Sequence, residues 1–130
     1  MRKGIFLIAC LSGFLATALG AFGAHGLKTV ASGEMLQIFG LAVDYHFYHT
    51  FALIGAALAG HWVKSKLLDY ACYAFIFGIV LFAGSLYSYV LTGTKFLAML
   101  TPLGGMGFLI GWLLLAAAVY QSNTEVHPES

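Results

Sequence analysis

The chain has 130 residues, of which 61% are hydrophobic and 8% are charged, and its formal net charge is +1. Soluble domains are about half apolar and about a quarter charged, so a soluble core of this size has no room for so much apolar surface. The small net charge and the lack of a basic run exclude nucleic acid as a partner. The composition predicts one polytopic membrane domain whose main partner is the lipid bilayer.

The first apolar run covers residues 4–24 and follows Arg2 and Lys3. A secretory signal has a shorter apolar region of about 7–15 residues, whereas about 20 residues cross a bilayer, so we expect a membrane-spanning helix. Residues 7–10 resemble a lipoprotein cleavage box. That alternative is disfavoured because cleavage there would leave only about six apolar residues before Cys10.

Residues 27–40 mix polar and apolar side chains and predict a short interfacial helix between the first two spans. Ser32 is suited to cap the N-terminus of this helix, and Glu34 is favourable at its positive end. We expect the interfacial helix to lead directly into the second span.

The second span is predicted over residues 41–62 and opens with the most polar intramembrane stretch of the chain, which runs from Asp44 to Thr50. On a helix Tyr45 and His49 are four residues apart and share a face. At 1.5 Å per residue, His49 lies about 12 Å below the start of the span. Below this stretch the helix is almost entirely aliphatic.

The third span is predicted over residues 68–91 and the fourth over residues 96–120. The third ends in small, hydroxyl and aromatic residues, and the fourth contains Pro102 about one turn after its start. Proline removes a helical hydrogen bond, so Pro102 should kink this helix or start it afresh. The polar, acidic residues 121–130 predict a disordered tail.

Small residues recur at steps that bring them onto single helix faces. Such faces let two helices approach closely in a membrane, and a GxxxG pair is typical of them. The glycines predicted to pack helices together are Gly13, Gly20, Gly23, Gly84, Gly104, Gly107 and Gly111. The pair formed by Gly107 and Gly111 also suggests a face for a homo-oligomer or another membrane protein.

Lysine and arginine residues predict the orientation of the four spans, because cytoplasmic loops carry the excess of these residues. Four of them precede the first span or follow the second, and two lie in the other loops, at positions 28 and 95. Both termini are therefore expected in the cytoplasm. In this topology the polar or irregular stretches of all four spans fall in the outer half of the bundle.

Ionisable residues inside a membrane are costly and are by default candidates for a functional site. The candidate polar-core or ligand site consists of His49, Tyr45, Asp44, Thr50, His25, Tyr87, Ser85 and Thr101. The leading interpretation is that these groups only hydrogen-bond across helices. A ligand, lipid or proton path around His49 is the main alternative.

A metal or a haem is disfavoured, and no metal or cofactor is predicted. His46 and His49 lack the glutamate of a zinc motif, and His25 comes near them only through folding. No nucleophile elbow, paired-carboxylate site or phosphate loop is present, so we expect no enzyme activity. Cys10 and Cys72 lack metal-type spacing and are expected to be free, buried thiols.

Four ordered motifs resemble a family of small, uncharacterised bacterial inner-membrane proteins typified by YgdD and YwdK. The motifs are Gly20-Ala21-Phe22-Gly23-Ala24-His25, Asp44-Tyr45 followed by His49-Thr50, Gly84-Ser85-Leu86-Tyr87, and Thr101-Pro102 with Gly104-Gly105 and Gly111-Trp112. In the family pattern the acidic residue also occurs as Glu, and His46 is not part of the motif. The resemblance therefore favours His49 over His46.

The resemblance implies four spans in a bacterial inner membrane and no known biochemical activity. The sequence thus predicts an all-α, four-helix antiparallel membrane bundle formed by residues 1–120. We expect a non-enzymatic structural or partner-binding component, with a small transporter or lipid-binding bundle as the alternative.

Overall fold

The computed structural model describes residues 2–122, and these residues form helices joined by short connections. Two of the elements are not α-helices: η1 is a 3₁₀ turn and η2 is a π-helical segment. In chain order the elements are α1 (Lys3–Ala24), η1 (Leu27–Thr29), α2 (Gly33–Ala59), α3 (Lys66–Gly78), η2 (Ile79–Ala83), α4 (Gly84–Thr92), α5 (Lys95–Ala98) and α6 (Thr101–Ser122).

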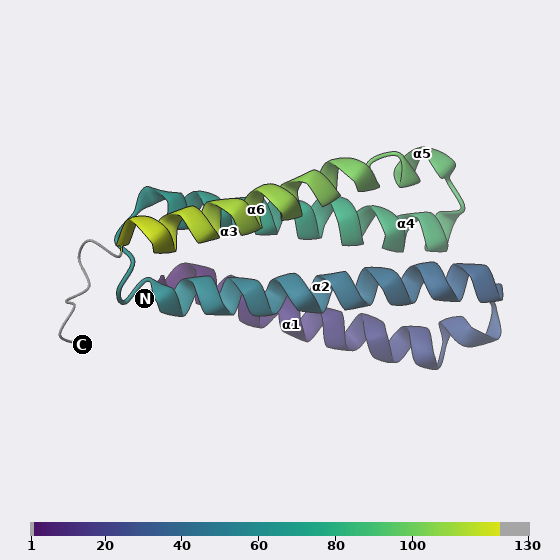
Figure 1. Cartoon of the computed structure of the whole chain (residues 1–130). Helices are drawn as coiled ribbons and strands as arrows, with labels where there is room; N and C mark the ends of the chain where they lie inside the picture. Colours follow the sequence, from purple (N-terminus) through teal and green to yellow (C-terminus); the bar gives the residue numbers. More distant parts are fainter. Residues whose placement is uncertain (1, 123–130) are drawn as a thin grey trace.

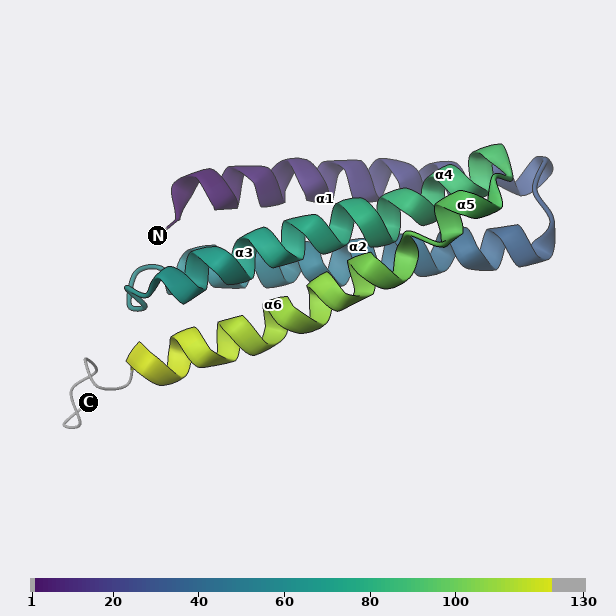
Figure 2. The same ribbon diagram turned by 90° about the horizontal axis from the view of Figure 1, so that it is seen from above.

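The helices form two antiparallel hairpins that lie on each other as two layers (Figure 1). One hairpin is α1 with α2, and the other is the continuous rod α3–η2–α4 with α6. Seen from above, α1 and α6 lie on opposite sides of the molecule (Figure 2). Packing between the layers is made by α2 against α3, η2 and α4. The described chain therefore begins and ends at the same end of the bundle.

The helix boundaries follow local chemistry. The hydroxyl of Ser32 accepts a hydrogen bond from the backbone N–H of Met35 and caps α2. Gly93 has φ of +73°, a left-handed conformation that suits glycine and ends α4. Pro102 lies in the first turn of α6, where a missing N–H costs little, so the chain starts a new helix there.

The expected separate interfacial helix is absent from the described residues. Only the three residues of η1 are helical between α1 and Ser32, and everything from Gly33 onward belongs to α2. The cap at Ser32 starts one long helix rather than a short one, because no proline interrupts α2 and a glycine such as Gly40 weakens a helix without ending it. Gln121 and Ser122, which were predicted to belong to the disordered tail, are the last two residues of α6. The rest of the predicted tail, residues 123–130, lies outside the described part.

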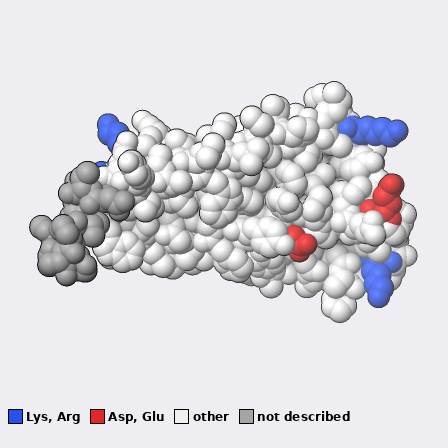
Figure 3. All heavy atoms as spheres, viewed as in Figure 1, with Lys and Arg blue, Asp and Glu red and all other residues white. Residues whose placement is uncertain are grey.

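Within residues 2–122, three helical rods are long and apolar enough to cross a membrane: Lys3–Thr29, Lys66–Thr92 and Lys95–Ser122. The remaining rod, α2, has 27 residues but is not among them, because the polar stretch from Asp44 to Thr50 lowers its mean hydropathy. On the face shown in Figure 3, lysine and arginine lie at the two ends and the flank between them is almost free of charge. The chain is an all-α membrane protein.

Two helices approach closely where α6 crosses η2. A Cβ atom at Gly104 would lie 2.7 Å from the carbonyl carbon of Leu81 and would overlap the backbone of Phe82. The π-helical turn widens the rod at this level, and only a residue without a side chain fits against it. The Gly104 contact therefore fixes the height of α6 against the third rod.

Two more glycines of α6, Gly107 and Gly111, extend the close packing of α6 along α3, toward the end of the bundle where the described chain begins and ends. A Cβ at Gly107 would lie 2.8 Å from the ring of Phe77, and one at Gly111 would lie 2.7 Å from the ring of Phe75. Both glycines are buried within the protomer. The GxxxG face is thus occupied by α3 and is not free for a second copy of the chain.

A polar cluster ties the ends of the helices together near both described termini. Arg2 Nε donates to Asp69 Oδ1 at 2.6 Å, and the backbone N–H of Arg2 donates to the carbonyl of Ala57 at 2.9 Å. Ser65 Oγ donates to Gln121 Oε1 at 3.2 Å. These bonds join the start of α1, the α2–α3 connection and the end of α6.

Candidate functional site

The two-layer arrangement leaves a groove on each side of the contact between α2 and the third rod. Within residues 2–122, α1 makes no extensive contact with α3, η2 or α4, so a first groove opens between them over α2. A second groove opens between α2 and α6 on the other side. Each groove has one buried histidine of α2 at its base, His46 in the first and His49 in the second.

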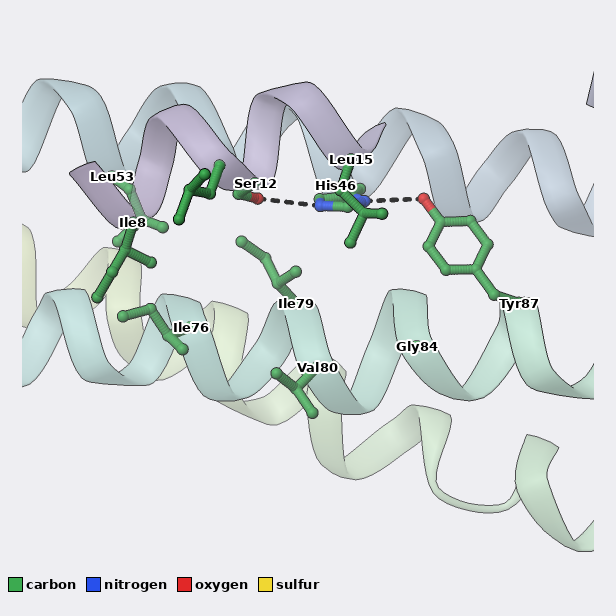
Figure 4. A pocket seen from close by; sticks show the side chains of 11 residues that line it. Ile8, Ser12, Leu15, His46, Leu53, Ile76, Ile79, Val80, Gly84 and Tyr87 are labelled. Carbon is green, nitrogen blue, oxygen red and sulfur yellow. Dashed lines mark hydrogen bonds between the residues drawn. The ribbon is translucent and has the colours of Figure 1, made fainter. Parts of the chain in front are cut away.

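The first groove has a volume of about 440 Å³. Its walls are aliphatic side chains, and its floor carries the polar groups of Ser12, His46 and Tyr87 (Figure 4). Leu11 is 70% exposed and Val80 is 62% exposed, so the groove opens sideways, toward the surroundings of the bundle. The aliphatic lining residues are Ile8, Leu11, Leu15, Leu53, Ile76, Ile79 and Val80.

The polar floor of the first groove is a hydrogen-bonded chain that joins three helices. His46 Nδ1 lies 2.8 Å from Tyr87 Oη of α4, and His46 Nε2 lies 2.9 Å from Ser12 Oγ of α1. Ser12 Oγ lies 2.6 Å from Thr50 Oγ1, one turn along α2. We call these four residues the His46 chain. Every member can either donate or accept a hydrogen bond, and the chain connects α1, α2 and α4 through largely buried polar atoms.

His49 is held in a different way, at the base of the second groove. The indole N–H of Trp112 donates to His49 Nε2 at 3.1 Å, and His49 Nδ1 lies 2.8 Å from the carbonyl oxygen of Tyr45. Because an indole only donates and a carbonyl only accepts, His49 is neutral and carries its hydrogen on Nδ1. Its ring stacks on Phe108 with centroids 3.5 Å apart and an interplanar angle of 6°. Both ring nitrogens are already occupied.

The second groove has a volume of about 630 Å³ and a more aromatic lining than the first. Tyr45, Tyr48 and Trp112 line it, together with Pro102. Tyr48 is 55% exposed, and His49 is 4% exposed. The second groove therefore has aromatic rings at its surface. Its buried histidine, His49, is hydrogen-bonded to Trp112 and so joins α2 to α6.

Ser85 and Thr101 form a third polar contact, apart from both histidines. Ser85 Oγ donates to the carbonyl of Phe82 at 3.1 Å and therefore accepts from Thr101 Oγ1, which lies 2.6 Å away. The carbonyl of Phe82 lies in η2, where the π-helical turn disturbs the regular hydrogen bonds. This pair joins the start of α6 to α4 and satisfies a backbone group beside Gly104.

The structure divides the predicted polar-core residues among separate locations. Tyr45 and His49 meet, Thr50 and Tyr87 belong to the His46 chain, and Ser85 pairs with Thr101. His25 is exposed at the end of α1, and Asp44 is exposed on α2. Among the described residues, no three histidine, cysteine or acidic side chains are placed to hold a metal ion. Cys72 is a buried free thiol, as expected, but Cys10 is exposed.

Three residues of these contacts were not among the predicted site residues: His46 and Ser12 of the His46 chain, and Trp112, which bonds His49. The four-residue spacing of His46 and Thr50 on one helix face was a signal for the His46 chain. Ser12 lies beside the predicted small-residue face of α1, where Gly13 meets Thr50. Trp112 was recognised as part of a motif, but the sequence did not indicate its bond to His49.

Comparisons with known proteins fit this all-helical membrane structure. Residues 19–105 match the family model described as "Protein of unknown function (DUF423)". The chain is 40% identical over 112 residues to the UPF0382 inner membrane protein YgdD of Escherichia coli K12, covering 85% of each protein. It is 38% identical over 117 residues to the UPF0382 membrane protein YwdK of Bacillus subtilis, covering 89% of this chain and 95% of YwdK.

A UPF0382 membrane protein of Haemophilus influenzae is 34% identical over 124 residues, which cover 95% of this chain and 99% of that protein. No solved structure matches the chain. The helical hairpins, the apolar flank and the full-length similarity to these relatives agree: the chain belongs to the DUF423 family of UPF0382 membrane proteins, whose function is unknown.

Proposed function

We propose that all four rods cross the bacterial inner membrane and that both termini are cytoplasmic. Two observations support this topology. α2 runs antiparallel beside α1 and packs on it over much of its length, from Phe39 against Gly23 to Thr50 against Gly13. Arg2, Lys3, Lys64 and Lys66 lie at or next to the end where α1 begins, and the other end carries Lys28 and Lys95. That imbalance favours cytoplasmic termini.

An alkaline phosphatase fusion after Ser130 tests the orientation. Alkaline phosphatase is active only after export, so we expect an inactive fusion at this position. A second fusion after Gly93, in the connection between α4 and α5, is the matched control and should be active. The reverse pattern would show that the termini face outward.

We propose that the protein is a non-enzymatic membrane bundle that binds an apolar molecule from the bilayer in its first groove. The observation that carries this function is the side opening of an aliphatic groove over a buried polar chain. A molecule that diffuses in the membrane plane reaches such a groove without leaving the hydrocarbon. Aliphatic walls with a few placed polar groups are typical of sites that bind small apolar ligands.

The first groove is a better candidate than the second because its polar side chains are largely buried at its floor, whereas Tyr45 and Tyr48, which line the second groove, are 36% and 55% exposed. In the second groove both nitrogens of His49 are bound within the protein, to Trp112 and Tyr45. In the first groove Tyr87 Oη and Ser12 Oγ each retain hydrogen-bonding capacity beyond the His46 chain, since a hydroxyl has one hydrogen and two lone pairs. These atoms are available to orient a ligand.

Filling the first groove tests the proposed function. A Cβ at Gly84, which lines the groove, has no atom within 4 Å, so Gly84→Leu should fill the groove without a clash. Gly55→Leu is the matched control: its Cβ is equally free, and Gly55 lines neither groove. Native mass spectrometry of the protein purified in mild detergent should show a retained lipid-sized molecule in the wild type and in Gly55→Leu. Gly84→Leu should lose it.

If Gly84→Leu and Gly55→Leu retained equal amounts of the lipid-sized molecule, binding in the first groove would be contradicted. If the species lost from Gly84→Leu is a protein, the groove binds a partner helix instead, and the protein is an assembly component.

A further inference from the structure

We propose that the first groove binds the carbonyl-bearing head of an isoprenoid quinone, with Tyr87 Oη as the donor to the carbonyl oxygen. This inference rests on the proposed function and names the class of ligand. It follows from three properties of the groove: its charge, its depth and the hydrogen-bonding capacity of the His46 chain.

The charge of the first groove requires a neutral ligand. None of its lining residues is Lys, Arg, Asp or Glu. A charged group moved to such a place would lose its hydration without gaining a counter-charge. Phosphate, carboxylate and ammonium head groups are therefore excluded from the groove.

The depth of the polar atoms excludes the ester groups of phospholipids as their partners. Ser12 lies nine residues after Lys3 and twelve before Ala24, so it is near the middle of a helix about 33 Å long. Tyr87 Oη lies 2.8 Å from His46 Nδ1, and His46 is thirteen residues from each end of α2, at its middle. In a hydrocarbon core about 30 Å thick these atoms lie beneath the head-group level. Only a lipid whose polar group is small and neutral brings it to this depth.

The His46 chain has two hydrogen-bond orientations, and one of them offers a free donor. In the first, Tyr87 donates to His46 Nδ1, Nε2–H donates to Ser12, and Ser12 donates to Thr50. In the second, Thr50 donates to Ser12, Ser12 donates to Nε2, and Nδ1–H donates to Tyr87 Oη. The Tyr87 hydrogen is then left for a ligand. Every bond distance in the chain, from 2.6 to 2.9 Å, suits both orientations.

A carbonyl oxygen fits this donor better than an alcohol does. A carbonyl needs only a donor, whereas a buried alcohol that accepts from Tyr87 brings a hydrogen of its own that also needs a partner. A carbonyl ligand therefore selects the second orientation of the His46 chain. Among neutral membrane lipids, a quinone combines such a carbonyl with a long branched hydrocarbon tail, which suits walls built from Ile, Leu and Val.

Equilibrium binding in nanodiscs of phosphatidylethanolamine and phosphatidylglycerol tests this inference. The probe is a radiolabelled benzoquinone with a short isoprenoid tail, and the competitor is the isoprenoid alcohol of the same tail length. We expect saturable binding of one quinone per protein and at least tenfold weaker competition by the alcohol. Tyr87→Phe, which keeps the ring but removes the donor, should bind the quinone about tenfold more weakly, as expected for one buried hydrogen bond.

Tyr48→Phe is the matched control, because Tyr48 lines the second groove, and its affinity should equal that of the wild type. Gly84→Leu should abolish binding and gives a second test if Tyr87→Phe folds poorly. The assignment would be overturned if the isoprenoid alcohol competed as well as unlabelled quinone does. It would also be overturned if Tyr87→Phe folded and bound the quinone with wild-type affinity. If Gly84→Leu loses a retained phospholipid but the wild type binds no quinone, the groove function stands and the quinone inference fails.

Discussion

Gly104→Ala is expected to destabilise the protein more than any other single-methyl change in α6. The added Cβ would overlap the backbone of Phe82 and lie 2.7 Å from the carbonyl carbon of Leu81. A backbone cannot turn aside as a side chain can, so α6 must move away from η2 along its length. Overpacking costs about 1–3 kcal/mol and occasionally more, and we expect the upper end of this range.

Gly105→Ala is the matched control, because its Cβ would lie 3.9 Å from the ring of Phe82, an ordinary contact. The free energy of unfolding is measured for both variants by titrating detergent-solubilised protein with sodium dodecyl sulfate and following the helical circular dichroism. Gly105→Ala should match the wild type or exceed it slightly, since alanine favours helix over glycine. Equal stability of the two variants would contradict the close crossing of α6 and η2.

His46→Leu is expected to lower the free energy of unfolding by about 1–3 kcal/mol, the usual cost of leaving a buried polar group without its partner. The substitution removes two bonds between helices. Ser12 keeps its bond to Thr50, so the hydroxyl of Tyr87 is the group that loses its partner. Replacing both His46 and Tyr87, as His46→Leu with Tyr87→Phe, should therefore cost less than the sum of the two single changes.

The double-mutant cycle measures this coupling directly. Inter-helix hydrogen bonds in membranes average about 0.6 kcal/mol and reach about 1.7 kcal/mol, and we expect the His46–Tyr87 pair at the upper end because both groups are buried. His25→Leu is the control and should leave stability unchanged, since His25 is exposed at the end of α1. Additive effects of the two single changes would mean that the imidazole and the phenol do not interact.

The sequence determined the features that depend on composition and on short-range chemistry. The apolar runs predicted membrane helices, and three of the four rods have the length and apolarity to span. Ser32, Gly93 and Pro102 lie at helix ends because each acts within a few residues of its own position. The separate interfacial helix was the wrong prediction, since no proline lies between Gly33 and the second span and Gly40 is tolerated inside α2.

Only the tertiary structure decided which polar groups meet. His46 and His49 are three residues apart and therefore differ by about 60° around α2, which is enough for them to face different grooves. Their surroundings come from other helices: Ser12 and Tyr87 in one groove, and Trp112 in the other. The motif pattern favoured His49 as the site residue. Both ring nitrogens of His49 are hydrogen-bonded within the protein, however, and it is His46 that lines the groove of the proposed ligand. Spacing along one helix fixes the angle between two side chains, whereas their partners depend on how the other helices pack.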